Sequence, residues 1–458
     1  MAEKKAGSKY EIDMCNGPIL KKMLIFTVPL MLSSVLQLLF NAADIIVVGK
    51  FAGDNSMAAV GSTSSLINLL VNLFVGISIG ANVLVARYFG AKQDKDLSDT
   101  VHTAMAVSVV SGIFLTIVGI VGAPAILKLM KTPGKVLDLA VLYLRVYFIG
   151  MTAMMIYNFG AAILRAKGDT KRPMYFLMLA GVINVVLNLV FVIIFKMDVA
   201  GVALATTISQ CVSAALVVMC LVKSDDAIRL NIKKMKIHVD KLVKILQIGL
   251  PAGFQGTLFS LSNVVIQSSI NSFGEIVVTG SSAAANIEGF VYVSMNAFSQ
   301  AAISFTSQNV GAGRYDRVNK ILYTALGCVT VVGLVLGNLA YFFGENLLNI
   351  YTDNPLVVEQ GLIRLSFICT TYALCGIMDV LVGSLRGLGY SIVPMIVSLI
   401  GACAFRIIFL ATIFKLDEFH YIETVYLTYP ISWILTITAH IISFVLIKRR
   451  INKRLRFS

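Results

Sequence analysis

The residues of this chain that could do chemistry are a few ionisable side chains embedded in long apolar stretches. The acidic ones are Asp44, Glu288 and Asp379, and the deepest basic one is Arg406. Arg145 and Arg364 also fall inside apolar stretches. A charge in apolar surroundings costs several kcal/mol, so each such residue is a functional candidate and should have a partner. These types of side chain favour proton or cation binding, or buried ion pairs.

Asp44 is the most isolated of these acids. It lies six positions before Lys50, which places it about 9 Å inside the end of its stretch at about 1.5 Å per helical residue. The segment Asn41-Ala42-Ala43-Asp44 is polar on one face and small on the other. We expect the carboxylate to face other helices and to be used by protonation or ion binding. The alternative is that it only hydrogen-bonds a neighbouring helix.

Three further charges lie in the second half of the chain. Glu288 and Arg406 are about 16 Å and about 14 Å from the same end of their stretches, so we predict that they meet as a buried ion pair. A functional role for Glu288 is equally open. Asp379 lies about 10 Å from the opposite end, as a gate, a second coupling site or a carboxylate that water reaches.

The elements that hold these residues must be membrane-spanning helices. Apolar residues make up 57% of the 458 positions and charged residues 14%, which excludes a soluble domain. The stretches run about 20 residues or more without strand-like alternation, which excludes a barrel. We predict twelve spans, over residues 20–48, 57–86, 100–127, 136–163, 173–195, 200–222, 243–272, 277–306, 320–344, 357–384, 391–414 and 424–447.

The chain also repeats itself at an offset of 221 or 222 residues. Leu164-Arg165 and Gly168 recur as Leu385-Arg386 and Gly389, and Pro29 recurs as Pro251. We therefore predict an all-α membrane protein with twelve transmembrane helices in two pseudo-symmetric six-helix lobes. The lobes are expected over residues 1–222 and 243–458, the second with a basic tail, and are joined by a cytoplasmic linker over residues 223–242.

Basic residues define the orientation of the predicted spans. The face that carries both termini has 29 Lys and Arg, against 6 on the opposite face, so both termini are expected in the cytoplasm. The net charge of +14 follows from inner-face runs such as Lys448-Arg449-Arg450, where anionic lipid is the expected neighbour. Nucleic-acid binding is not expected.

The chain offers little for catalysis. Its four histidines show no metal or nucleophile spacing, and no Walker loop is present. We therefore expect a protein that is not an enzyme and needs no cofactor. Pro29 is a candidate hinge on the helix that carries Asp44, with a static kink as the alternative. Met151 and Met155 could line an adaptable pocket, although ordinary packing is more common.

At this point the chain resembles the multidrug and toxic compound extrusion (MATE) family of ion-coupled efflux transporters, over about residues 18–447. The resemblance is carried by the Leu-Arg-x-x-Gly repeats and by the segments Asn41-x-x-Asp44-x-x-x-x-Gly49, Gly90-Ala91 and Gln308-Asn309-x-Gly311-Ala312. The segment Asn286-Ile287-Glu288-Gly289-Phe290 resembles the MepA-like group of Gram-positive bacteria.

The resemblance implies a central cavity of alternating access and a set of site residues. Asp44 matches the family's aspartate of the first helix and Pro29 its bending proline. The polar cluster around that aspartate maps onto Tyr143, Asn184, Asn188 and Thr206. Asn188 departs from the pattern, because one branch has an aspartate there, and this puts the coupling ion in doubt. Proton or sodium is implied, with Asp44 as the ligand if the ion is sodium.

The function expected from this sequence is a secondary efflux antiporter for cationic, amphipathic compounds in the bacterial cell membrane. We expect it to be a monomer in contact with membrane lipids. A lipid-linked saccharide flippase of the same superfamily is the alternative, for which extra carboxyl-terminal spans and a basic cavity would be expected. A membrane receptor is not expected, because a typical receptor has no use for the two-lobe repeat. A membrane-embedded enzyme is not expected either, because the chain lacks a catalytic constellation.

Overall fold

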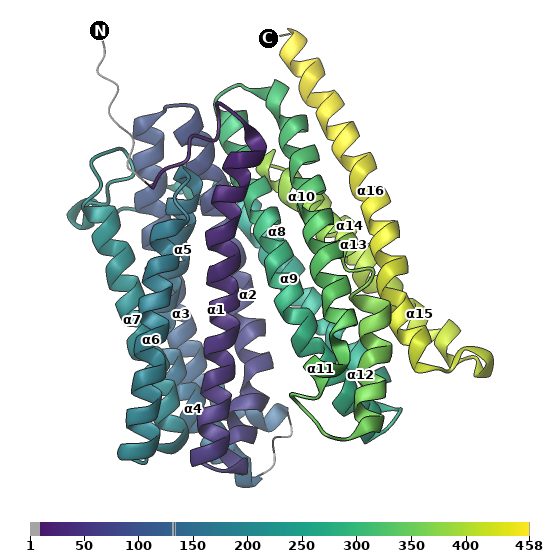
Figure 1. The fold of residues 1–458 in the computed structure, drawn as a ribbon. Coiled ribbons are helices and arrows are strands. Elements are labelled where there is room, and N and C mark those ends of the chain that lie inside the picture. Colours follow the sequence, from purple (N-terminus) through teal and green to yellow (C-terminus); the bar gives the residue numbers. More distant parts are fainter. Residues whose placement is uncertain (1–9, 131, 133, 458) are drawn as a thin grey trace. The chain divides into compact units, whose positions relative to one another are not determined.

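The computed structural model describes residues 10–130, 132 and 134–457, and over these residues the chain forms helices and no strand (Figure 1). Residues 1–9, which belong to the predicted first lobe and its basic amino terminus, lie outside the described residues. Each of the twelve predicted spans coincides with a helix or with a broken helix among the residues described. The predicted fold class is therefore confirmed.

The first six spans are formed by α1 (Ile19–Phe51), α2 (Asp54–Gly90), α3 (Asp94–Leu129), α4 (Gly134–Ile149) with α5 (Met151–Lys167), α6 (Lys171–Leu189) with the π-helical turn η1 (Val190–Ile194), and α7 (Asp198–Val222). The other six are formed by α8 (Val239–Asn271), α9 (Glu275–Gly311), α10 (Tyr315–Phe342) followed by the short α11 (Gly344–Leu348), α12 (Pro355–Ile368) with α13 (Ala373–Gly387), a broken segment of α14 (Ile392–Ser398), η3 (Leu399–Ala404), α15 (Phe405–Ala411) and η4 (Ile413–Lys415), and α16 (Ile422–Phe457).

Length and apolarity support a multi-pass membrane protein. Among the described residues, nine helices are long and apolar enough to cross a membrane, and eleven spans result if each bent pair is one span. The bent pairs are α4 with α5 and α12 with α13, and their bends measure 46° and 47°. α8 is not in this set, although it has 33 residues. The two bends occupy equivalent positions in the repeat, because Gly150 shifted by 221 residues falls in the break between α12 and α13.

The repeated Leu-Arg-x-x-Gly motif forms the same turn twice. Gly168 and Gly389 adopt the left-handed conformation, with φ of 107° and 95°, which a side chain would strain. The N–H of Gly168 donates to the Arg165 carbonyl at 3.0 Å, and the N–H of Gly389 donates to that of Arg386 at 2.8 Å. Both turns end a helix in the same way. The two halves of the chain therefore repeat a local structure as well as a sequence motif.

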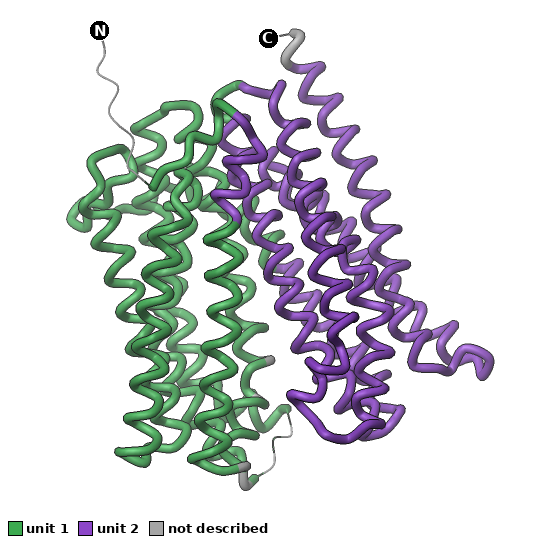
Figure 2. Tube along the Cα trace, viewed as in Figure 1, with its two compact units in different colours: residues 1–17, 28–253, 311–313 green, residues 18–27, 254–310, 314–458 purple. Residues whose placement is uncertain are grey.

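The chain divides into two compact units, which Figure 2 shows in different colours. One unit contains residues 1–17, 28–253 and 311–313, and the other contains residues 18–27, 254–310 and 314–458. The division passes through α1 just before Pro29 and through α8 just after Pro251. The two prolines of the repeat thus mark the places where a helix changes unit. The lobe boundaries predicted from the sequence stay a prediction.

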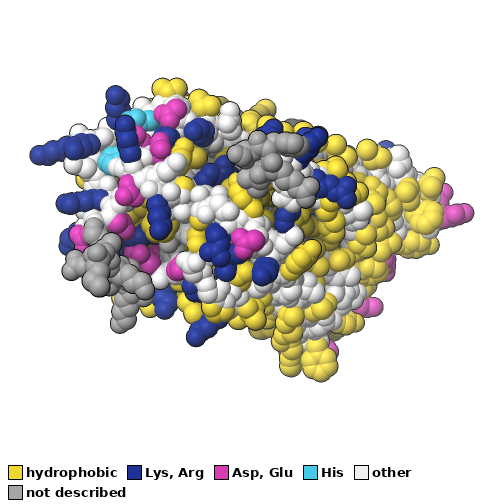
Figure 3. Space-filling view, turned by 90° about the horizontal axis from the view of Figure 1, so that it is seen from above, with side chains coloured by type: hydrophobic (Ala, Val, Ile, Leu, Met, Phe, Trp, Pro, Cys, Tyr) yellow, Lys and Arg dark blue, Asp and Glu magenta, His cyan; other side chains and the backbone are white. Residues whose placement is uncertain are grey.

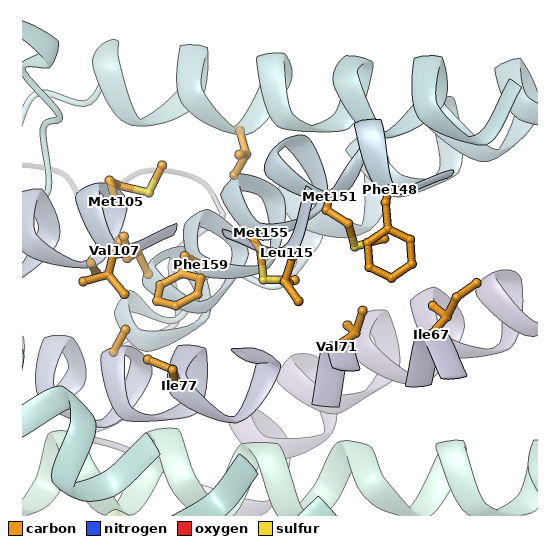
Figure 4. Close-up of a cluster of buried hydrophobic side chains, with 14 of the residues drawn as sticks. Ile67, Val71, Ile77, Met105, Val107, Leu115, Phe148, Met151, Met155 and Phe159 are labelled. Carbon is orange, nitrogen blue, oxygen red and sulfur yellow. The ribbon is translucent and has the colours of Figure 1, made fainter. Parts of the chain in front are cut away.

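The core of the first unit is packed with large apolar side chains from α2, α3, α4 and α5. Figure 4 shows Met151 and Met155 beside Leu115, Phe148 and Phe159 in this cluster. Both methionines are fully buried, so they serve in packing and do not line a pocket.

The predicted linker follows α7 and is held to α3 by hydrogen bonds. The backbone N–H of Asn231 donates to His102 Nε2 at 3.1 Å, and that of His238 donates to Thr103 Oγ1 at 3.0 Å. Lys241, at the start of α8, donates to Asp96 at 2.5 Å and is 3.0 Å from Asp240. Burial alone would lower the pKa of Lys241, but the two carboxylates outweigh it and raise that pKa above its usual range.

Candidate ion-binding site around Asp44

A small cavity in the first unit is lined by one face each of α1, α6 and α7. The lining residues on each helix occupy positions i, i+3, i+4 and i+7, which lie on one helical face. They are Gln37, Phe40, Asn41 and Asp44 on α1, Leu177, Ala180, Gly181 and Asn184 on α6, and Thr206, Ser209, Gln210 and Ser213 on α7. The sequence thus predicted Asp44, Asn41, Asn184 and Thr206 in one site, and the structure brings these four residues together.

A chain of hydrogen bonds joins Asp44 to α6 and α7. Asn188 Nδ2 donates to Asp44 Oδ1 and also lies 3.3 Å from Asn184 Oδ1. Asn184 Nδ2 donates to Thr206 Oγ1 at 3.2 Å, and Thr206 donates to the Val202 carbonyl at 3.0 Å. All members of this chain other than Asp44 are neutral, so the negative charge of Asp44 has no cationic partner here.

The environment of Asp44 is mostly buried and contains several side-chain oxygen atoms. Asp44 is 9% exposed, and Asn188 is fully buried. None of the twelve lining residues is basic. Two amide oxygens, Asn188 Oδ1 and Gln210 Oε1, are buried without a hydrogen-bond partner among the described residues. Asn188 Oδ1 belongs to the amide whose nitrogen donates to Asp44, whereas Gln210 Oε1 lies close to Gly150, at the break between α4 and α5. A buried amide oxygen without a partner is a ligand that a small hard cation would use.

The size of the cavity restricts what it can hold. Its volume is about 110 Å³, which is room for a few water molecules or an ion. Pockets for drug-sized ligands measure roughly 300–1,000 Å³. The cavity around Asp44 is therefore an ion-sized site in this conformation.

Three aromatic residues and a glycine lie in or near this region. Tyr143 on α4 is buried and stacks on Tyr147 with ring centroids 5.7 Å apart, but it is not among the residues that line the cavity. Phe40 packs over Gly181, where a Cβ atom would meet the Phe40 ring at 1.7 Å. Gly181 therefore has to lack a side chain for Phe40 to take this position.

In the second unit, the predicted pair of Glu288 and Arg406 is wrong. Glu288 instead pairs with Arg364 of α12 in a bidentate ion pair, with Arg364 Nε 2.8 Å from Oε1 and Nη2 2.9 Å from Oε2. Arg364 Nη1 also donates to Ser281 at 2.8 Å. Both charges are buried and matched in geometry, as a stable buried pair requires.

Arg406 finds partners of another kind. Its Nε donates to Ser432 Oγ at 2.8 Å, and its guanidinium lies 4.2 Å from the centre of the Tyr429 ring and 5.8 Å from that of Trp433. Arg406 is 3% exposed. Its charge is therefore stabilised by aromatic faces instead of a carboxylate.

Asp379 belongs to a separate polar cluster of the second unit, on α13. Its side chain hydrogen-bonds those of Tyr292 and Asn296, and its carbonyl accepts from Ser299 at 2.7 Å. Arg386 donates to Gln255 at 2.9 Å. The Asp379 side chain is half-buried. None of the residues that line the cavity around Asp44 belongs to the Asp379 cluster.

From the sequence, Arg364 is a charge inside an apolar stretch with no assigned partner, and Gln37 and Gln210 have no assigned role. Arg364 could have been identified from its depth, because it lies nine residues after the start of α12, or about 14 Å along the helix. Lys415 does end the broken span that contains Arg406, so the depth of Arg406 was not the error; its side chain points to Ser432 of α16 instead of to Glu288. Gln37 and Gln210 lie on the faces of Asn41 and Thr206, and helical spacing alone would have found them.

The comparisons with known proteins agree with this architecture. The MatE family profile matches residues 29–190 and 251–412, two segments related by the 222-residue offset of the repeat. The chain is 28% identical to the probable multidrug resistance protein YoeA of Bacillus subtilis, over 83% of each chain. It is 21% identical to the multidrug export protein MepA of Staphylococcus aureus, over 82% of this chain and 83% of that protein.

A solved structure shows the same fold. A crystal structure of MATE in complex with MaL6 matches 97% of this chain and 99% of its own, with a TM-score of 0.88 and 22% sequence identity. The helices, the internal repeat and the two profile matches all lead to one assignment. The chain belongs to the MatE family of multi-pass membrane transporters, not of enzymes.

Proposed function

We propose that this protein is a secondary active multidrug efflux antiporter of the bacterial cell membrane, which exchanges H⁺ or Na⁺ for cationic amphipathic compounds by alternating access. The observation that carries the proposal is the buried carboxylate of Asp44, which has only neutral partners in an ion-sized cavity. The names of YoeA and MepA, for multidrug resistance and export, support the substrate class.

Asp44 links the two fluxes through competition for one negative charge. A buried carboxylate without a cationic partner is stabilised when it takes up a proton or a sodium ion. A cationic substrate that approaches the same charge makes the bound ion less stable, and the ion lowers the affinity for substrate by the same factor. Exchange of ion for substrate requires two conditions. Each conformation must be open to one side of the membrane, and the conformations must interconvert only when the ion or the substrate neutralises the charge of Asp44.

The cavity argues against the alternative substrate class. A lipid-linked saccharide carries phosphate, which requires basic side chains, and none of the twelve residues around Asp44 is basic. We further propose that the protein acts as a monomer. We also propose that both termini lie in the cytoplasm, because the carboxyl-terminal helix α16 ends in a basic run.

The test is uptake of a fluorescent lipophilic cation into inside-out vesicles, with a proton gradient and a sodium gradient imposed separately. Asp44→Asn keeps the shape of the side chain and removes its charge, so gradient-driven uptake should fall to background under the gradient that drives the parent. Glu275→Gln removes an exposed acid at the start of α9 and should leave uptake unchanged. Full uptake by a folded Asp44→Asn protein would refute the role of Asp44.

A further inference from the structure

A second cavity, which the proposed transport cycle does not use, lies in the second unit between α10, α13 and α16. We call it the α10–α16 groove. Its volume is about 420 Å³. α13 packs against both α10 and α16 and contributes Leu381 to the floor of the groove. The walls are one face of each outer helix, with Asn319, Leu322, Tyr323 and Leu326 on α10 and Ile441, Phe444, Val445, Lys448, Arg449 and Asn452 on α16.

The polarity of the groove changes along its length. On α16 the apolar residues Ile441, Phe444 and Val445 come first, and Lys448 and Arg449 follow about one turn later. On α10 the order is reversed in sequence, with Asn319 before the apolar residues. Lys448 Nζ donates to Asn319 Oδ1, which places the polar ends of the two walls at the same level. One end of the groove is therefore polar and cationic, and the other is apolar.

The polar end carries an excess of positive charge. No acidic residue lines the groove, and the nearby acid at the start of α10, Asp316, pairs with Arg314 at 3.6 Å. α16 also carries Arg450 within this stretch, and Lys453 and Arg454 follow the last lining residue, Asn452. Figure 3 shows the end of the molecule at which Lys and Arg side chains gather. Arg449 is exposed, so its guanidinium is free to meet a ligand from outside.

We propose that the α10–α16 groove is a binding site for an anionic phospholipid of the leaflet that faces the basic tail. The lipid phosphate contacts Lys448 and Arg449, and part of one acyl chain lies against Leu326, Leu381 and Phe444. The match of charge at one end and of apolar surface at the other selects this occupant. A cationic amphipathic substrate would be repelled by the polar end, and a zwitterionic lipid would gain less from it.

The test is native mass spectrometry of the whole protein, released from micelles that contain equal amounts of phosphatidylglycerol and phosphatidylcholine. The parent should retain phosphatidylglycerol selectively. Each basic residue near an anionic headgroup contributes roughly fivefold in affinity, so Lys448→Gln with Arg449→Gln should weaken that retention by about 25-fold. Lys453→Gln with Arg454→Gln removes the same charge from α16 outside the groove and should change retention by less than about twofold.

A third variant tests the apolar end without changing charge. Leu326→Trp fills the groove and should reduce phosphatidylglycerol retention while Lys448 and Arg449 remain. Glycerol phosphate at millimolar concentration should not displace the lipid. Equal losses in the two double variants would show unspecific attraction to the basic tail, and displacement by glycerol phosphate would show a site for free phosphate. Either outcome, or retention unchanged in Leu326→Trp, would overturn the proposal, and thermal denaturation of each variant confirms folding.

Discussion

Asn188 gives Asp44 a neutral neighbour where a second carboxylate would compete for the same cation. Its amide nitrogen donates to Asp44 and its buried oxygen has no hydrogen-bond partner among the described residues. An amide can donate to a carboxylate and, after a flip, accept from a carboxylic acid. Asn188 can therefore stabilise Asp44 in both states of charge, and one cation is enough to neutralise the site.

Removal of either partner of the Glu288–Arg364 pair should destabilise the protein strongly. Loss of one partner leaves a buried charge uncompensated, which costs about 3–5 kcal/mol, whereas loss of both removes the problem. Glu288→Gln and Arg364→Met should therefore each lower the melting temperature in detergent more than the double variant does.

The control for this comparison of single and double variants is Arg406, which contacts aromatic rings instead of Glu288. Glu288→Gln combined with Arg406→Met should give additive losses of melting temperature. Two outcomes would contradict the pairing seen in the structure. One is an additive loss of melting temperature when Glu288 and Arg364 are replaced together, and the other is a non-additive loss when Glu288 and Arg406 are replaced together.

Gly181 shapes the cavity around Asp44 through the packing of α6 against α1. Gly181→Ala places a methyl group into the Phe40 ring, and overpacking of this kind costs about 1–3 kcal/mol. Phe40 must then move, which should lower transport without the loss of any polar side chain. Phe40→Leu in the same chain makes room and should restore part of the activity. Vesicle uptake by the single and double variants measures both effects, and no rescue by Phe40→Leu would argue against this contact.

Pro29 stands where α1 passes from one compact unit to the other, which is the place where a hinge in α1 would act. Pro29→Ala allows one more backbone hydrogen bond and should favour a straight helix. Substrate binding in detergent should survive, and turnover in vesicles should drop. The matched control is Pro124→Ala in α3, a helix that lies within one unit and should tolerate the change. Equal turnover in the two variants would make Pro29 a static kink.

The positions of the helices were easier to predict from the sequence than the side-chain contacts between them. The spans followed from apolar length, because a bilayer demands about 20 apolar residues in a row. The bends at Gly150 and between α12 and α13 could not be read from composition, since both segments stay apolar through the break. The site on α1, α6 and α7 was found from Asp44 and the family resemblance, but the partner of Glu288 depends on helix rotation as well as depth, and depth alone selected Arg406.

At the scale of the whole molecule, the distribution of Lys and Arg predicts which ends of the helices face the cytoplasm. Single cysteines at Lys50 and Lys415, in a background without the seven native cysteines, should react with an impermeant maleimide in intact cells. Cysteines at Lys233 and Arg450 should react only in inside-out vesicles. All four positions are exposed, so access depends on the side of the membrane. Labelling of Lys233→Cys from outside would reverse the proposed orientation.

The repeated halves share helices and turns, including the arginine of the Leu-Arg-x-x-Gly turn, but they do not share Asp44 or the Glu288–Arg364 pair. Asp44 corresponds to Ile266 at the 222-residue offset, and Glu288 and Arg364 correspond to Ile67 and Tyr143 at the 221-residue offset. A half-length ancestor that paired with a copy of itself would have carried every charge twice, because one sequence served both subunits. Fusion into one chain freed each copy to mutate alone. Duplication thus allowed the buried carboxylate of Asp44 to arise in one half and a buried ion pair in the other, on the same inherited scaffold.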